Sequence, residues 1–360
     1  MIENKVTPAK RYKNIFKILN KELPMKPSKK ELTHLLLNTF KTDSEIYIYT
    51  IENIIKNILS KLKNEKKLNF KTIANKLGVS QRLIYHYQKG TRPISIKNLF
   101  ILLDLLDETT EKLDFSKRNC LILASSSGSR NKLCKIPLQF SSDLFYVAGY
   151  LFGDGCLHTN KWTLSFVDEY KNHIEKISNL IKHIFEINTT ITIEKGKTEL
   201  ATYSKVLFIF FKTIFEMPVG VKKNQLHIPT ILGKFPKRNQ LAFLSGLFDA
   251  DAGTLRIEEY LSIPKWFLKS PNIEFVQADC NFVYEIKELC TKLGLKPTGP
   301  YFNPANKGYR LFLCGRNTLQ QCKNISLFRH PIKQKRLSLI CTYFKLEGGI
   351  APPNSSSLKN

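Results

Sequence analysis

VAGYLFGDG (residues 147–155) and LSGLFDADA (residues 244–252) are two copies of one short pattern, and the second follows the first by 97 residues. Each copy is mostly apolar, and each has an aspartate as its last residue but one, Asp154 in the first and Asp251 in the second. Both runs have the composition of a buried helix segment. The sequence therefore predicts two similar helices, each ending in an acid.

Small residues recur at four-residue spacing in both copies: Gly149 and Gly153 in the first, Gly246 and Ala250 in the second. Residues four apart share one face of a helix. A face of small residues lets two helix backbones approach closely, while the flanking apolar side chains become buried. We expect the two helices to pack on each other through these faces with pseudo-twofold symmetry.

Such packing would bring Asp154 and Asp251 side by side at one end of the helix pair. Two carboxylates held close together repel each other unless a cation neutralises them, and Mg²⁺ prefers oxygen ligands of this kind. Paired metal ions serve phosphodiester hydrolysis by activating water and stabilising the leaving oxygen. The alternative is that both acids are ordinary helix ends, although a carboxylate is electrostatically unfavourable at a helix C-terminus.

The charge of the chain indicates a polyanionic partner. Its 360 residues include 56 lysines and arginines but only 30 acidic residues, which gives a net charge of +26. Residues 1–140 carry +15 and the remainder carries +11, so both parts are basic. This distribution favours nucleic acid as the partner of the whole molecule, although a genome rich in lysine codons would give a similar excess.

Other classes of protein are disfavoured by what the sequence lacks. No run of about 18 apolar residues occurs and the start, MIENKVTPAKRYKN, has no signal-peptide core, so we expect no membrane association. The expected location is intracellular, cytoplasmic or, in a eukaryote, organellar. The eight cysteines form no CxxC pair, so we expect reduced thiols and no zinc site. Met1 and the final SLKN lack the groups used for protein splicing, which is therefore not expected.

Composition and periodicity divide the chain into six regions. The motif regions are two halves in which similar helices and strands follow each motif helix in the same order, as in an internal duplication. The second half carries an insertion, YLSIPKWFLKSPN. The expected regions are a basic leader (1–30), a helical domain (31–113), a linker with an exposed Ser/Gly stretch (114–140), the two halves (141–235 and 236–345) and a disordered tail (346–360).

The helical domain contains a stretch, residues 68–106, that resembles the Cro/phage-repressor helix-turn-helix. Gly78 supplies the backbone freedom of the turn, and Ser80 can cap the second helix. Inward positions are apolar, and the outward residues near the start of the second helix suit DNA contacts in the major groove. The alternative is a helical bundle that binds a protein or positions the next domain. The inward residues are Ile73, Ala74, Leu77, Leu83, Ile84 and Tyr87; the DNA-binding candidates are Ser80, Gln81, Arg82, Tyr85 and His86.

The duplicated motifs resemble those of the LAGLIDADG homing endonucleases, whose single-chain members carry two of them; the resemblance covers residues 137–341. It implies an α+β fold in which two αββαββα halves form a pseudo-twofold saddle over DNA, each with a four-stranded antiparallel sheet. An all-α helix-turn-helix domain would precede the saddle. It also implies that Asp154 and Asp251 bind divalent metal and act in catalysis.

The family adds a basic residue near each cleavage centre. GVKKNQLHIP places Lys222 or Lys223 in that role for the first half, and HPIKQKRL places Lys333 or Lys335 there for the second. These four lysines are therefore catalytic candidates by resemblance.

Two positions depart from the family pattern. Phe152 stands where the first copy would usually have its earlier motif aspartate, whereas the second copy keeps Asp249. Ala252 replaces the final motif glycine, and Gly253 directly after it is a candidate to restore the turn. Both metal-binding acids are kept, which favours an active nuclease.

Outward residues of the predicted strands are candidates for reading DNA in the major groove, although an ordinary solvated strand face is the alternative at each position. These residues are Lys161, Thr163, Thr192, Glu194, Arg256, Glu258, Gln277, Tyr301 and Arg310.

The sequence as a whole predicts a monomeric, site-specific DNA endonuclease that hydrolyses one phosphodiester in each strand with Mg²⁺, for which Mn²⁺ can substitute. A DNA-binding regulator that does not cut is one alternative, because similar scaffolds occur in sporulation regulators. An intron maturase with RNA as its partner is the other.

Overall fold

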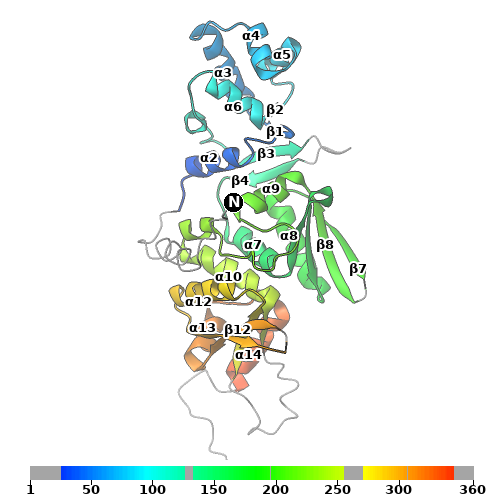
Figure 1. Ribbon diagram of the computed structural model, residues 1–360, viewed down its shortest axis with the longest axis vertical. Coiled ribbons are helices and arrows are strands. Elements are labelled where there is room, and N and C mark those ends of the chain that lie inside the picture. The colour runs from blue at the N-terminus through cyan, green and yellow to red at the C-terminus, as the bar shows by residue number, and fades with distance from the viewer. Residues whose placement is uncertain (1–25, 126–132, 195, 255–270, 306, 344–360) are drawn as a thin grey trace, which may run out of the picture. The chain divides into compact units, whose positions relative to one another are not determined.

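The computed structural model describes residues 26–125, 133–194, 196–254, 271–305 and 307–343 (Figure 1). These residues form two compact units. One, called the motif unit, contains residues 145–155 and the described residues from 221 onward. The other, called the N-terminal unit, contains residues 26–144 and 156–220.

The motif unit contains both motif helices and one sheet. The sheet has the strand order β9-β10-β12-β11, with antiparallel pairing at each of its three ladders. Helices α12 and α13 contact the sheet, and α14 packs on α13. The elements are α7 (Ser142–Asp154, whose first three residues belong to the other unit), η3 (Thr230–Lys234), α10 (Lys237–Asp251), β9 (Ala252–Thr254), β10 (Asn272–Gln277), α12 (Cys280–Lys292), β11 (Pro297–Asn303), β12 (Gly308–Cys314), α13 (Arg316–Asn324) and α14 (Pro331–Tyr343).

The N-terminal unit contains two four-stranded sheets. One has the order β2-β1-β3-β4 and the other β5-β6-β8-β7. The elements are α2 (Lys29–Thr39), β1 (Ile46–Tyr49), α3 (Glu52–Asn64), α4 (Phe70–Leu77), α5 (Gln81–Lys89), β2 (Ile94–Ser95), α6 (Ile96–Asp104), η1 (Thr110–Lys112), β3 (Cys120–Ser125), β4 (Cys134–Pro137), β5 (Gly155–His158), η2 (Asn160–Trp162), β6 (Thr163–Asp168), α8 (Lys171–Phe185), β7 (Thr190–Glu194), β8 (Lys197–Tyr203) and α9 (Lys205–Ile214).

The first sheet of the N-terminal unit corrects the expectation for residues 31–140. The supposed linker contains β3 and β4, and the supposedly all-helical domain contributes β1 and β2. Strand β1 pairs with β3 from Ile46 opposite Ser125 to Tyr49 opposite Ile122. The Ser/Gly stretch lies outside the described residues except for Ser125. Pairing between segments so far apart in the chain leaves no local period in the sequence, which is why the strands were not predicted.

The other two sheets follow one plan. A short strand comes directly after each motif helix, β5 after α7 and β9 after α10, and each sheet then has the same relative strand order. The ladder of β6 with β8 has its counterpart in the ladder of β10 with β12, and both are antiparallel. This agreement is what an internal duplication would produce; the duplication and the saddle themselves stay predictions.

The sequence also led us to expect no membrane-spanning helix, reduced cysteines and no zinc site. No helix in the described part of the chain is long and apolar enough to cross a membrane. All eight cysteines are free, and four of them are buried: Cys134, Cys290, Cys322 and Cys341. Burial raises the pKa of the Cys134 thiol. Within the described ranges no group of three or more His, Cys, Asp and Glu side chains is arranged to hold a metal.

Candidate active site at the paired motif helices

Helices α7 and α10 pack closely, with a glycine of each helix against the backbone of the other. A Cβ atom added to Gly149 would lie 1.9 Å from the carbonyl oxygen of Phe243, and one added to Gly246 would lie 2.0 Å from the carbonyl oxygen of Tyr146. Phe243 lies 97 residues after Tyr146, the same offset that relates the two glycines. The contacts are therefore reciprocal, and the predicted close packing through small residues is confirmed.

The same interface continues to the ends of the two helices. A Cβ atom on Gly153 would lie 2.3 Å from the Cβ atom of Ala250 and 3.2 Å from Oδ2 of Asp251. The C-terminal turns are thus in contact, and the acid of α10 lies directly beside the last turn of α7. No side chain larger than hydrogen fits at Gly153 without displacing α10.

The two acids at the helix ends have unequal surroundings. Asp154 is exposed, whereas Asp251 is half-buried. Burial, followed by the negative charge of Asp154, raises the pKa of Asp251 to about 7. A hydrogen bond donated by Nε2 of Gln277 (2.6 Å) and the charges of Lys222 and Lys333 partly offset this rise in pKa. The carboxylates are close enough to repel each other, so a bound cation would favour their ionised forms.

One lysine holds the carbonyl groups at the C-terminal end of each motif helix. Nζ of Lys222 donates to the carbonyl oxygens of Phe152 (2.9 Å) and Gly153. Nζ of Lys333, on α14, donates to the corresponding carbonyls of Asp249 and Ala250 in the second copy, the latter at 3.2 Å. Each ammonium group thus adds positive charge at a helix end that already carries an acid, where the partial charge of the helix is negative.

These contacts separate the lysine candidates into two pairs. Lys222 and Lys333 lie against the motif helices, whereas Lys223 and Lys335 are exposed. A catalytic role for any of the four lysines stays a prediction.

We expect Lys222→Met and Lys333→Met to slow DNA cleavage roughly 10²- to 10³-fold, the scale of losing one preorganised electrostatic group. The matched changes Lys223→Met and Lys335→Met, each close by in sequence, should leave the rate within about threefold, because exposed charges are strongly screened. Single-turnover cleavage of a cut site by all four variants makes the comparison. Equal losses in both pairs would show that bulk charge, rather than position, matters.

The departure at Phe152 is explained by comparison with Asp249, the corresponding residue of the second copy. Asp249 is buried, and its Oδ2 atom accepts hydrogen bonds from the hydroxyl of Tyr146 (2.7 Å) and from the backbone amides of Arg329 and His330 (2.9 Å each). Burial raises the pKa of Asp249 to about 6, and these bonds together with the charge of Lys333 act in the opposite direction. Asp249 therefore fixes the segment that leads into α14 and Lys333.

The pseudo-symmetric counterpart of this polar pair is apolar. At the 97-residue offset Asp249 corresponds to Phe152 and Tyr146 corresponds to Phe243. The rings of Phe152 and Phe243 pack edge to face with centroids 5.3 Å apart. A polar residue thus faces a polar one and an aromatic residue faces an aromatic one, so Phe152 leaves no buried polar group unsatisfied at this contact.

The second departure also needs no compensation. Ala252 caps α10 in extended geometry (φ −96°, ψ 144°) and is buried as the first residue of β9. This conformation is open to any residue. The expectation that Gly253 restores a turn is therefore wrong, because no left-handed residue is required there.

We expect Tyr146→Phe to lower the free energy of unfolding of the motif unit by about 1.5–3 kcal/mol, because it removes a buried hydrogen bond to a carboxylate. Tyr301→Phe, which changes the same atom on a side chain that is 56% exposed, should be neutral. Urea unfolding of both variants makes the measurement. Equal stability of the two would mean that the Tyr146 hydroxyl contributes nothing.

The residues predicted to read DNA from the strands differ in their contacts, in the element that holds them and in their exposure. Gln277 donates to Asp251, so it belongs to the acid site. Arg310 forms an ion pair with Glu274 across the β10–β12 ladder (Nε to Oε1, 3.0 Å). Lys161 lies in η2 with φ 55°, not in a strand, and Thr163 begins β6. Thr192, Glu194 and Tyr301 are exposed strand residues, and Arg256 and Glu258 lie outside the described residues.

Helices α4 and α5 have the local geometry of the predicted helix pair. Gly78 ends α4 in the left-handed conformation (φ 64°, ψ 35°), and the side chain of Ser80 caps α5 by accepting from the amide of Leu83 (3.3 Å). The outward residues Gln81, Arg82 and Tyr85 are exposed, whereas His86 is half-buried with Nδ1 2.8 Å from the hydroxyl of Thr91. DNA binding by this surface stays a prediction. Of the inward residues, Leu83 is only half-buried; the buried ones are Ile73, Ala74, Leu77, Ile84 and Tyr87.

Solved structures to which the chain is similar include homing endonucleases bound to DNA and a LAGLIDADG domain. The homing endonuclease I-DmoI in complex with DNA and Ca aligns at 17% identity over 55% of this chain and 97% of that chain, with a TM-score of 0.40. I-WcaI bound to its DNA recognition sequence aligns at 14% over 54% and 85%, with a TM-score of 0.38. The N-terminal LAGLIDADG domain of DUF199/WhiA aligns at 10% over 52% and 83%, with a TM-score of 0.34.

No protein-family model matches the chain. Among curated proteins, a probable translation initiation factor IF-2 of Methanocaldococcus jannaschii is 28% identical over 257 residues, which cover 68% of this chain and 20% of that protein. Elongation factor 2 of Methanopyrus kandleri is 25% identical over 240 residues, 66% of this chain and 17% of that protein. The chain thus spans about a fifth of the length of these relatives. That the chain does not take part in protein splicing stays a prediction.

Proposed function

We propose that the protein is a site-specific, metal-dependent DNA endonuclease that cuts both strands, in the manner of the LAGLIDADG enzymes that its motifs resemble. The observation that carries the proposal is the reciprocal packing of Gly149 and Gly246, which places Asp251 beside the end of α7 and close enough to Asp154 for their charges to interact. Two carboxylates held against mutual repulsion, with a lysine at each helix end, are arranged to meet a cation and a phosphate together.

The residues at the helix ends fit a divalent metal. Asp154 and Asp251 would hold it, since Mg²⁺ is commonly bound by one or two carboxylates with water and substrate phosphate completing its shell. The raised pKa of Asp251 supports this fit, because burial and the charge of Asp154 disfavour its ionised form, which a bound cation would stabilise. When bound, the metal would supply activation of water and stabilisation of the leaving oxygen; Mg²⁺ is the proposed ion, and Mn²⁺ can substitute.

The protein's own side chains supply orientation and charge. Gln277 donates to Oδ2 of Asp251 and so fixes the direction in which its other oxygen points. Lys222 and Lys333 lie within hydrogen-bond reach of the last turns of the motif helices, and their positive charges lower the pKa of Asp251. In the proposed complex the same charges stabilise the extra negative charge that develops on the phosphate during hydrolysis.

The decisive experiment incubates the full-length protein with Mg²⁺ and a plasmid carrying the sequence that flanks its gene. Specific linearisation that EDTA abolishes and added Mg²⁺ or Mn²⁺ restores is the expected result. Tight binding of the same DNA without cutting in either metal would refute the nuclease and favour a regulator. Preferential binding of intron RNA without DNA cutting would favour a maturase.

A further inference from the structure

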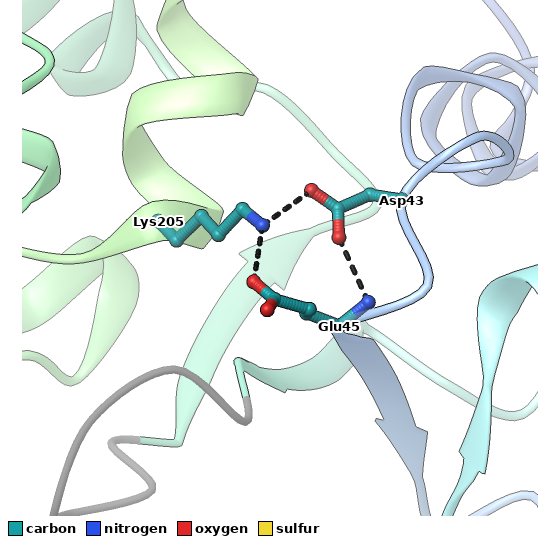
Figure 2. A network of polar contacts seen from close by, with 3 residues as sticks. All are labelled: Asp43, Glu45 and Lys205. Atoms are coloured by element: carbon teal, nitrogen blue, oxygen red, sulfur yellow. Dashed lines mark hydrogen bonds and ion pairs between the residues drawn. The ribbon is translucent and has the colours of Figure 1, made fainter.

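A nearly buried lysine joins the segment before β1 to the start of α9 within the N-terminal unit. Lys205, the first residue of α9, lies between two acids of the segment before β1 (Figure 2). Its Nζ atom is 2.8 Å from Oδ2 of Asp43 and 2.6 Å from Oε2 of Glu45, and its side chain is only 10% exposed. The ammonium also lies over the ring of Trp162, 5.1 Å from the centroid. These contacts tie the segment before β1 to the start of α9.

Apolar packing surrounds this ion cluster. Helix α2 and strand β3 contact α9, and strand β4 contacts α8. Phe140, just after β4, packs against the rings of Phe210 and Phe215 with centroids 5.8 and 6.3 Å apart. The region between residues 114 and 140 is therefore part of a packed interface, and it does not behave as a free tether over its described length.

A continuous set of contacts leads from this interface to α5. Strand β2 pairs with β1, with Ser95 opposite Tyr47, and the side chain of Ser95 caps α6 by accepting from the amide of Asn98 (3.2 Å). Helix α6 contacts α4, which packs on α5. Each link is a paired strand or a packed helix of the same unit.

We infer that residues 26–125 and the sheet β5–β8 act as one rigid DNA-reading body, so that the protein requires a long target in which the segment bound by α5 lies at a fixed spacing from the segment bound by the sheet β5–β8. The inference rests on the proposed function. A flexible tether would permit many spacings; a docked module permits one, because each inserted base pair both lengthens the DNA and rotates the outer segment about its axis.

The test first locates the two protected segments by footprinting the full-length protein on a DNA that it cuts. Five base pairs, about half a helical turn, are then inserted between them. The expected result is a loss of roughly 10²-fold in affinity, down to that of DNA without the outer segment, because one of two linked contacts is lost. Unchanged affinity, with both segments still protected, would overturn the inference while leaving the nuclease intact. A protein that binds no DNA at all would overturn both.

Variants of Lys205 connect this behaviour to the interface. Lys205→Met should bind the original DNA more weakly but tolerate the insertion within about threefold, as a tethered module does, whereas Lys205→Arg should behave as wild type. Lys171→Met, which removes an exposed ion pair with Glu175 on the same unit, is the matched control. A Lys205→Met protein that remains folded and is as sensitive to the insertion as wild type would contradict docking through this cluster.

Amide hydrogen exchange checks the docking without DNA and covers the case in which Lys205→Met does not fold well. In the wild type, amides of α2 and α9 should exchange with similar protection, since they belong to one cooperative unit. Exchange of α2 that is far faster than that of α9 would show that the N-terminal region opens independently, and would overturn the inference.

Discussion

Asp251→Asn and Asp154→Asn are each expected to abolish the proposed double-strand cutting, with a loss of about 10³-fold or more in the single-turnover rate. Either change would remove a charged oxygen ligand of the proposed metal, and the transition-state stabilisation that a bound metal provides amounts to several kcal/mol. The assay is linearisation of plasmid in Mg²⁺ at fixed protein excess. Asp104→Asn, which changes an exposed acid at the end of α6, serves as control and should cut normally.

The same variants should not lose stability, and this separates a functional role from a structural one. Because burial and Asp154 raise the pKa of Asp251 from 3.8 to about 7, its ionised form is disfavoured in the folded state. Stability linked to this group is therefore full below about pH 4 and is lost as the pH rises through 7. At pH 8 Asp251→Asn removes the penalty, so urea unfolding without metal should show equal or greater stability. A variant that is both inactive and strongly destabilised would indicate a mainly structural acid.

Gly246→Ala is expected to destabilise the motif unit by roughly 1–3 kcal/mol or more, the range for forcing extra atoms into a packed core. The new Cβ atom would lie 2.0 Å from the carbonyl oxygen of Tyr146 and 2.7 Å from the amide nitrogen of Tyr150. Both obstacles are backbone atoms, so no side chain can rotate away and the two helices must separate. Gly149→Ala should have a similar effect, since its Cβ atom would meet Phe243 in the same way.

The control for the glycine variants is Gly253→Ala. A Cβ atom at Gly253 meets nothing within 4 Å, and the residue lies in β9 without a left-handed backbone, so its unfolding curve should match that of the wild type. If Gly246→Ala unfolds at the same urea concentration as Gly253→Ala, the close approach of the two helices is refuted. Cleavage should fall with the separation of the helices, because the acids move with them.

The motif helices could be predicted from sequence because everything that defines them is local: spacing of small residues, apolar flanks and a final acid. Their meeting could be predicted as well, since two faces of the same shape at a 97-residue offset have each other as the natural partner. The sheet formed by β1 to β4 could not, because Ile46–Tyr49 pairs with residues more than 70 positions later. No pattern in the sequence of β1 or β3 identifies the other strand as its partner.

Two details of the site, the choice between Lys222 and Lys223 and the role of Gln277, depend on three-dimensional geometry that the spacing of residues in the sequence does not show. Lys222 and Lys223 are neighbours, and only the path of the segment after α9 decides which one reaches α7. Gln277 was placed on the DNA-reading face by strand alternation alone, yet as the last residue of β10 it reaches Asp251. The register of β10 against β9, with Phe275 opposite Ala252, brings the end of β10 back to the end of α10, and no spacing in the sequence reports that register.

The unlike pairs across the helix interface also determine which halves can associate. In a hypothetical dimer through two copies of α10, the buried Asp249 of one chain would face Phe243 of the other and would lose its bond from the Tyr146 hydroxyl. Through two copies of α7, that hydroxyl would face Phe152 and have no acceptor there. Losing a buried hydrogen bond is costly, so each self-pairing is penalised, whereas the pairing within one chain keeps the bond between Tyr146 and Asp249. The contacts at this interface thus favour the pairing of α7 with α10 over the pairing of either helix with its own copy. This preference disfavours exchange of halves between molecules, and so it favours two acids contributed by a single polypeptide.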